Sequence, residues 1–323
     1  MPPGRHPASV TGALLPLTVA IGNYGLTRAL KSGAVKAKGL DLEFVEVEPI
    51  TAAMRRMARG LEFDICEMAF TTYLCARAVG KKLTAIPVFL TRNFHHWAAF
   101  HNVNSGIRAP KDLEGRKVAC NRGYTVTTNL WVRGILQHEY GVDLDSIAWL
   151  PTDEEHVAEY KAPANVDYAK RGRRMEDLLL KDGIGAALGD VRVDSPDIKP
   201  LIPDARQAGF AYYRKTGIYP INHGVVMKES LLRERPEFAR ALFDAFTAAK
   251  AEYRAHLAAG KDLTPADKTA LELGAVVGDP FPFGIAANRK ALEAMAQFAA
   301  EQQITRRRMS VAELFAPDTL DLA

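Results

Sequence analysis

The sequence predicts a two-lobed α/β protein with mainly parallel sheets, helices on both sheet faces and a ligand cleft between the lobes. Its 323 residues exceed what one ordinary hydrophobic core organises. Strand-like and helix-like segments alternate along the first part of the chain, as in parallel sheets whose crossovers are helices. A second unit of the same kind follows, and the chain then returns to the first. We expect residues 1–102 and 212–323 to form lobe 1 and residues 103–211 to form lobe 2.

Alternation in the first unit is clearest at residues 40–47, where apolar and acidic residues follow each other with period two. This pattern predicts a half-buried strand. The next segment predicts a helix with Thr51 as its N-cap and Gly60 just past its end. The expected strands of this unit are 17–21, 40–47, 63–68 and 85–90, and the expected helices are 26–32, 51–59 and 71–79.

The second unit opens with a turn and helix that lead into a strand ending at Ala119. After a loop, an apolar pattern predicts a helix from about Thr127 to Tyr140. The remaining expected strands are 147–150, 184–188 and 224–227, and the remaining expected helices are 174–181, 237–258 and 288–303. The chain returns to the first unit near Tyr212.

Charge and cysteine content narrow the function classes. The net charge is only +4, and the basic residues are scattered among acidic ones, so a nucleic-acid partner is not expected. Cys66, Cys75 and Cys120 form no CxxC pair and leave an odd count. Buried, reduced thiols in a reducing compartment are therefore expected rather than a disulfide framework.

The N-terminal region only superficially resembles an export signal. Arg5 precedes an apolar run over residues 10–21, but Pro16 interrupts it, and residues 17–21 are better interpreted as the first buried strand. No run is long enough to span a membrane. We expect a cytoplasmic protein without a membrane partner, and a homo-oligomer remains an open option.

Candidate ligand-binding positions follow from the layout. Open parallel sheets bind ligands at the carboxyl ends of their strands, and interfaces between domains favour pockets. The segments at those positions are 23–24, 67–72, 92–96, 121–128, 189–190 and 222–223.

Four sequence segments resemble the 4,5-dihydroxyphthalate decarboxylase family. They are Gly60-Leu61-Glu62-Phe63-Asp64-Ile65-Cys66-Glu67-Met68, Trp131-Val132-Arg133-Gly134-Ile135-Leu136-Gln137, residues 213–223, and Ile86-Pro87-Val88-Phe89 with Arg92 and His96 following. The resemblance runs from about Leu17 to Lys250. It implies the type 2 periplasmic-binding-protein fold, used for enzymology without secretion. It also implies loss of CO2 from a dihydroxylated aromatic dicarboxylate, which gives a catechol carboxylate.

The resemblance leaves the substrate open. Members usually carry serines after the Glu-Met pair, whereas this chain has Ala69-Phe70. They also tend to have Arg-His-Ser where this chain has His95-His96-Trp97. These positions are expected to face the ligand.

Aromatic decarboxylation needs a proton donor for the ring carbon, and histidine or a carboxylic acid fits that role. His96 and His223 both fall on expected loops after strands and match histidines of the family pattern, so both are catalytic candidates together with Glu67. His95 is the expected supporting neighbour, and Asn222 adjoins His223. Two histidines and a carboxylate could also bind one divalent metal ion, although no close-spaced ligand motif such as HxxxH occurs.

Substrate-binding candidates complete the expected site. Arg92 and Arg122 could bind carboxylates, and the helix start at Thr127 and Thr128 offers free backbone N–H groups, although ordinary N-capping also explains these threonines. Aromatic side chains near strand ends could stack on a ring: each alone is better explained by packing, but five of them together favour an aromatic substrate. These are Tyr24, Phe70, Phe94, Trp97 and Tyr124. Arg133, inside the expected helix, is assigned a structural role.

Two function classes remain in competition. The first is a decarboxylase of a hydroxylated aromatic carboxylic acid that uses no cofactor or one divalent metal ion. The second is a solute-binding protein or sensor for such an acid, which needs the same lobes but no proton donor. No nucleophile triad or P-loop occurs, and Gly22-Asn23-Tyr24-Gly25 lacks the spacing of a dinucleotide-binding loop.

Overall fold

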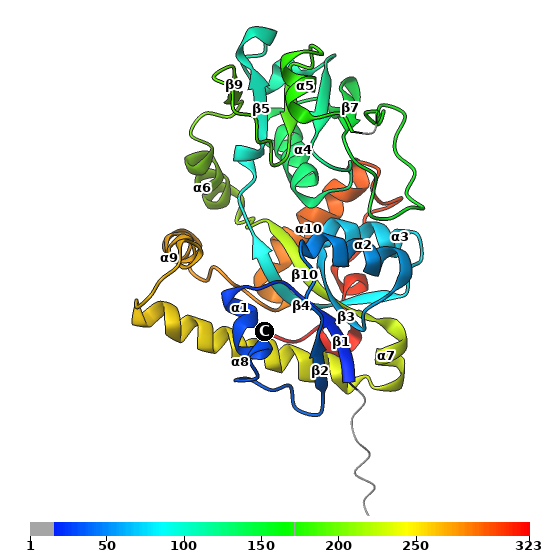
Figure 1. Cartoon of the computed structure of the whole chain (residues 1–323), viewed down its shortest axis with the longest axis vertical. Helices are drawn as coiled ribbons and strands as arrows, with labels where there is room; N and C mark the ends of the chain where they lie inside the picture. The colour runs from blue at the N-terminus through cyan, green and yellow to red at the C-terminus, as the bar shows by residue number, and fades with distance from the viewer. Residues whose placement is uncertain (1–15, 171) are drawn as a thin grey trace, which may run out of the picture.

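The structure is a computed structural model that describes residues 16–170 and 172–323. Arg5 and the first half of the apolar run considered as an export signal lie outside these residues. The described chain forms two lobes, each built on a five-stranded sheet (Figure 1). Among the described helices, none combines the length and apolar character needed to cross a membrane.

Lobe 1 contains a sheet of strand order β2-β1-β3-β10-β4. Strands β1 and β3 run parallel, as do β1 and β2, whereas β10 is antiparallel to both β3 and β4. The strands are β1 (Pro16–Ala20), β2 (Asp41–Phe44), β3 (Ile65–Ala69), β4 (Leu83–Arg92) and β10 (Ile221–Lys228).

Helices cover both faces of this sheet. Along β3 all side chains are buried, and they alternate between faces: Ile65 packs with α1 and α8, whereas Cys66 packs with α2, α3 and α10. This two-sided burial explains the continuous apolar character of the strand. The helices are α1 (Gly25–Lys31), α2 (Ile50–Gly60), α3 (Phe70–Ala78), α7 (Glu229–Glu234), α8 (Glu237–Ala259), α9 (Pro265–Val277) and α10 (Ile285–Glu301).

Two details of these helices differ from expectation. The N-cap of α2 is Pro49, so Thr51 lies within the first turn and caps nothing. Helix α9 was not expected, although its start carries a strong signal: Pro265 follows Thr264, and Thr264 and Asp267 form a capping box.

Lobe 2 contains a sheet of strand order β7-β6-β8-β5-β9. Here β6 runs parallel to β7 and β8, and β5 is antiparallel to β8 and β9. The strands are β5 (Ala99–Asn102), β6 (Lys117–Cys120), β7 (Ala148–Pro151), β8 (Ala186–Leu188) and β9 (Ile198–Pro200), and the helices are α4 (Thr127–Tyr140), α5 (Met175–Leu180) and α6 (Ala205–Thr216).

The crossings between lobes explain why each sheet, although mainly parallel, contains one antiparallel strand. The antiparallel strand in each sheet is the first one formed after the chain enters that lobe, β5 in lobe 2 and β10 in lobe 1. Because β5 pairs within the second sheet, the first crossing precedes Ala99, a few residues before the expected boundary at 102.

One edge of the lobe 1 sheet faces lobe 2. Strand β4 ends at this edge, and the chain then continues to β5. Strands β1 and β3 end at the same edge, and β10, which is antiparallel to β3 and β4, begins there. The loop after β1, the end of β3 and the start of β10 therefore meet. They carry Tyr24, Glu67 and His223.

Candidate active site

Glu67, Tyr24 and His223 form one hydrogen-bonded group at this edge. The Nδ1–H of His223 donates to Glu67 Oε1 at 2.6 Å, and the Tyr24 hydroxyl donates to the same oxygen at 2.9 Å. The backbone N–H of Gly22 donates to Glu67 Oε2 at 2.8 Å. The register explains the pairing: Val225 lies opposite Glu67, and His223 is two residues along β10 on the same face.

The surroundings of Glu67 compensate its burial. Its side chain is fully buried in the middle of β3, where an unpaired carboxylate would be costly. Three donors, one of them the adjacent imidazole, offset that cost. Burial, with a further contribution from the Glu67 charge, raises the pKa of Tyr24 above its usual value, so Tyr24 remains a phenol and a donor.

Gly22 is required for this arrangement. A Cβ at this position would lie 2.5 Å from the hydroxyl oxygen of Tyr24 and 2.6 Å from the ring carbon that bears it. Any larger residue would push the Tyr24 ring away from Glu67. The segment Gly22-Asn23-Tyr24-Gly25 is therefore a loop shaped around an aromatic side chain.

The geometry suits proton transfer through His223. The hydrogen bond to Glu67 fixes the ring and assigns the proton to Nδ1, which leaves Nε2 as the second site. The side chain of His223 is 20% exposed, whereas that of Glu67 is sealed. A carboxylate behind a histidine stabilises the imidazolium when it forms.

His95 and Asn222 lie near this group but serve another contact. Asn222 is next to His223 on β10, so its side chain points to the opposite face, where its Oδ1 accepts from His95 Nε2 at 2.7 Å. Burial lowers the pKa of His95 to about 4, so the ring is neutral near pH 7. His95 therefore pairs with Asn222 and not with Glu67.

His96 is not brought to Glu67 and His223. It lies in a short helical turn (His96–Ala98), where its Nε2 pairs with Glu139 of α4 at 2.9 Å and its ring packs edge-on against Tyr212 of α6. The suggested ligand set Glu67, His96 and His223 is therefore not assembled. Among the described residues, no group of three His, Cys, Asp or Glu side chains is placed to hold a metal ion.

The Arg92 guanidinium, which was expected to bind a carboxylate, makes its contacts within the fold. It donates to the carbonyl oxygens of Tyr219 and Pro282 and to the side chain of Asn288. Its guanidinium carbon lies 5.1 Å from the ring centres of Phe89 and Tyr219. The sequence correctly predicted that Arg92 lies at the end of a strand. It did not predict the direction in which the side chain points.

The expected anion site before α4 holds a carboxylate of the chain itself. Glu155 accepts from the backbone N–H groups of Tyr124 and Thr125, and from the hydroxyls of Thr125 and Tyr168. A Cβ on Gly123 would lie 2.6 Å from Glu155 Oε2, so this glycine permits the close approach. Sequence reasoning missed Glu155, which lies in a loop without any motif.

The other lobe 2 residues that were expected to bind a ligand lie in different surroundings. Thr127 Oγ1 accepts from the backbone N–H of Thr71 at 3.3 Å, and Thr128 is half-buried in the first turn of α4. Arg122 is exposed, in a left-handed conformation with φ of 64°. Tyr124 is turned away from the cleft, because its ring lies 3.7 Å from the Arg133 guanidinium and its hydroxyl donates to Gln302. The structural role assigned to Arg133 is confirmed, since it is buried and donates to Gln302 and Tyr124.

The aromatic candidates are mostly core residues. Phe70 packs with Tyr73, Phe89 and Phe315. Phe94 packs with Phe210, Tyr213 and Tyr219 in a separate cluster. Trp97 is half-buried against the core shared by the lobes. Of the five candidates, Tyr24 is the one that lines a sizeable cavity.

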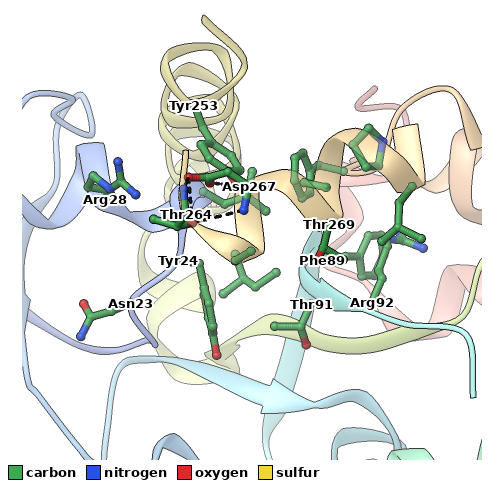
Figure 2. Close-up of a pocket in the computed structure, with 18 of the residues that line it drawn as sticks. Asn23, Tyr24, Arg28, Phe89, Thr91, Arg92, Tyr253, Thr264, Asp267 and Thr269 are labelled. Carbon is green, nitrogen blue, oxygen red and sulfur yellow. Dashed lines mark hydrogen bonds between the residues drawn. The ribbon is translucent and has the colours of Figure 1, made fainter. Parts of the chain in front are cut away.

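That cavity, the lobe 1 pocket, has a volume of about 800 Å³ and lies between α1, β4, α8 and α9 (Figure 2). In the close-up, Tyr24 and Thr91 lie on one side, with Tyr253, Thr264 and Asp267 across from them. Tyr24 contacts both the lobe 1 pocket and Glu67. The pocket therefore adjoins the Glu67–His223 pair.

Acid is expected to destabilise the fold through two buried histidines. Burial lowers the pKa of His95 and of His156 from 6.5 to about 4. The unfolded chain therefore binds more protons than the folded chain between these pH values. The free energy of unfolding should fall as the pH drops from about 6.5 towards 4, by on the order of 3 kcal/mol for each histidine.

Chemical denaturation at several pH values measures this loss of stability. His95→Gln keeps a side-chain donor for Asn222 but does not titrate, so its stability should depend less on pH than that of the wild type. The surface variant His138→Gln is the control and should retain the wild-type dependence. Equal pH dependence in all three proteins would contradict the assignment.

Comparisons with known proteins find one family model and two curated relatives of the same name. Residues 24–256 match the family model described as NMT1/THI5 like. A curated relative from Comamonas testosteroni, named 4,5-dihydroxyphthalate decarboxylase, is 30% identical over 327 residues, covering 95% of this chain and 98% of the relative. A protein of the same name from Pseudomonas putida is 28% identical over 214 residues, covering 62% of this chain and 82% of the relative.

Comparison with solved structures identifies the architecture. The periplasmic aliphatic sulphonate binding protein SsuA from Escherichia coli matches with a TM-score of 0.54 and 12% identity, over 94% of this chain and 98% of that chain. At this identity the likeness shows the fold alone. The predicted periplasmic-binding-protein fold is confirmed.

Proposed function

The chain belongs to the 4,5-dihydroxyphthalate decarboxylase family and to the NMT1/THI5-like family, and from this membership we propose that it is a carboxy-lyase acting on a hydroxylated aromatic carboxylic acid. The substrate class follows from the name shared by the curated relatives. One structural observation carries the mechanism: His223 is held through Nδ1 by a sealed carboxylate while its ring remains partly exposed. A protein that only binds its ligand has no need of this arrangement.

The reaction exchanges a carboxylate for a proton on the ring. Protonated His223 donates the proton on Nε2 to the ring carbon that bears the carboxylate, and a C–H bond forms. The C–C bond to the carboxylate then breaks, its electron pair returns to the ring, and CO2 leaves. Neutral His223 takes a proton from solvent to complete the cycle. Acid catalysis of this kind contributes about 10²–10⁴-fold.

The substrate supplies the rest of the driving force. A hydroxyl ortho or para to the carboxylate stabilises the positive charge on the protonated ring. Rotation of the carboxylate out of the ring plane aligns the breaking bond with the ring π system. Glu67 stabilises the imidazolium before the transfer, and Tyr24 and Gly22 hold Glu67 in place.

The test is a screen of the purified protein against hydroxylated benzoates and phthalates, with release of CO2 as the readout. Parallel samples with a chelator determine whether a divalent ion contributes. We expect turnover of at least one acid with a hydroxyl ortho or para to a carboxylate. Tight binding without CO2 release throughout the panel would contradict the proposal and favour a solute-binding protein or sensor.

A further inference from the structure

We infer that the aromatic ring of the substrate binds in the lobe 1 pocket beside Tyr24, with Arg28 as its carboxylate-binding residue, and not in the cleft between the lobes. This inference rests on the proposed function and adds the location and recognition of the substrate. Four observations carry it: the contacts that close the cleft, the clamp at α10, the lining of the pocket and the charge at its rim.

The cleft between the lobes is closed by direct contacts. The backbone N–H of Thr71, in the first turn of α3, donates to Thr127 Oγ1 in the first turn of α4. The indole N–H of Trp131 donates to the carbonyl oxygen of Ile221 at 2.8 Å, and both groups are buried. Further contacts between the lobes are the ion pairs Arg55–Asp153, Arg59–Glu154 and Lys81–Glu159. These contacts join the facing ends of the two lobes.

Helix α10 clamps the lobes together. It comes from the C-terminal part of the chain and packs against α4 of lobe 2 (Figure 1). The Phe298 ring lies so near Gly134 that a Cβ there would be 2.1 Å from a ring carbon. The Phe298 ring also stacks on His138, with 4.8 Å between centres, and Gln302 accepts from buried Arg133 at 2.8 Å. Opening the cleft would have to break this packing.

The lobe 1 pocket suits an aromatic ring. At about 800 Å³ it falls within the range of small-molecule sites. Its lining includes the aromatic side chains of Tyr24, Phe89, Tyr253 and Phe281. Thr91 also lines it and pairs across the sheet with His223, so the pocket meets the catalytic pair at two positions.

The rim supplies a cation for an acidic ligand. Arg28 lines the pocket, and it forms no ion pair or side-chain hydrogen bond with any other residue that the structure describes. Lys31 is also at the rim, but its ammonium is paired with Glu46 at 2.6 Å. Arg28 is therefore the cation available to a carboxylate, and its guanidinium allows bidentate binding. A substrate anchored there can direct its reacting carboxylate towards His223.

The outer wall of the pocket is rigid. Buried Asp267 of α9 accepts from the Tyr253 hydroxyl at 2.6 Å and from the Thr264 hydroxyl at 2.8 Å. Tyr253 in turn covers Gly25, where a Cβ would lie 2.1 Å from the ring. Because α9 is fixed to α8 and α1 in this way, its inner side limits the size of the ring that fits.

Filling the pocket tests the inference. Ala266 is an exposed residue of α9 that lines the pocket, and Ala275 is an exposed residue of the same helix that does not. We expect Ala266→Trp to lower kcat/KM by at least about 30-fold and Ala275→Trp to stay within about twofold of the wild type. Thermal unfolding checks that both variants fold. Wild-type kinetics for Ala266→Trp, with loss of activity on blocking the cleft by Thr128→Trp, would overturn the inference.

Arg28 provides a second, independent readout. Arg28→Gln should raise KM by about 10-fold or more with little change in kcat, because it removes binding and not the proton donor. Arg28→Lys should recover part of the loss. Equilibrium binding of phthalate to the same variants separates the two proposals. Binding that depends on Arg28 without CO2 release would overturn only the proposed function, whereas turnover insensitive to Arg28 and Ala266 would overturn only the location.

Discussion

His223→Gln is expected to lower kcat for CO2 release by about 10³-fold or more. Glutamine can still donate to Glu67 but has no ionisable group, so proton delivery to the ring carbon is lost. KM should change little, because the carboxylate is bound elsewhere. Steady-state kinetics with the best acid from the screen measures both constants.

The control for this variant is His138→Gln. His138 also pairs with a glutamate, Glu301, at 2.7 Å, but at the surface and away from the strand edge. It should keep wild-type turnover. If His223→Gln and His138→Gln were equally active, His223 would not be the proton donor.

The second large effect is expected for Glu67→Gln, which should lower kcat by about 10²–10⁴-fold. The amide matches the carboxylate in shape but has a single acceptor oxygen for three donors, so one of Gly22, Tyr24 or His223 must face an NH2 group. The imidazolium of His223 also loses its counter-charge. The loss should fall on kcat with KM little changed, which a purely structural defect would not cause.

The matched control is Glu139→Gln, which alters the other partly buried glutamate–histidine pair, Glu139–His96. This variant should lose some stability and keep its kcat. A kcat for Glu67→Gln no lower than that for Glu139→Gln would show that Glu67 does not act through His223.

The sequence predicted the fold well where periodicity and capping act locally. Helix α4 was expected from Thr127 to Tyr140 and has those bounds. Glu67 and His223 were placed at strand ends, and the structure joins them. Their direct contact depends on the antiparallel pairing of β10 with β3, which no local pattern encodes because it arises from the return of the chain from lobe 2.

The side chains that point in directions the sequence did not predict share one physical explanation. Proximity to a strand end gives the position of a residue but not the direction of its side chain. Arg92 turns towards the carbonyl oxygens of Tyr219 and Pro282, and Tyr124 turns beneath Arg133. His96 turns towards Glu139 of α4. Each direction is set by residues far away in the sequence.

The central claim is that the Glu67–His223 pair delivers a proton to the carbon that loses CO2. The most direct measurement is turnover of the active acid in D2O, with the product examined by mass spectrometry and NMR. The account predicts one deuterium per CO2 released, at the carbon that bore the carboxylate, and loss of this product in His223→Gln. Binding of the acids without CO2, or wild-type label incorporation by His223→Gln, would contradict it.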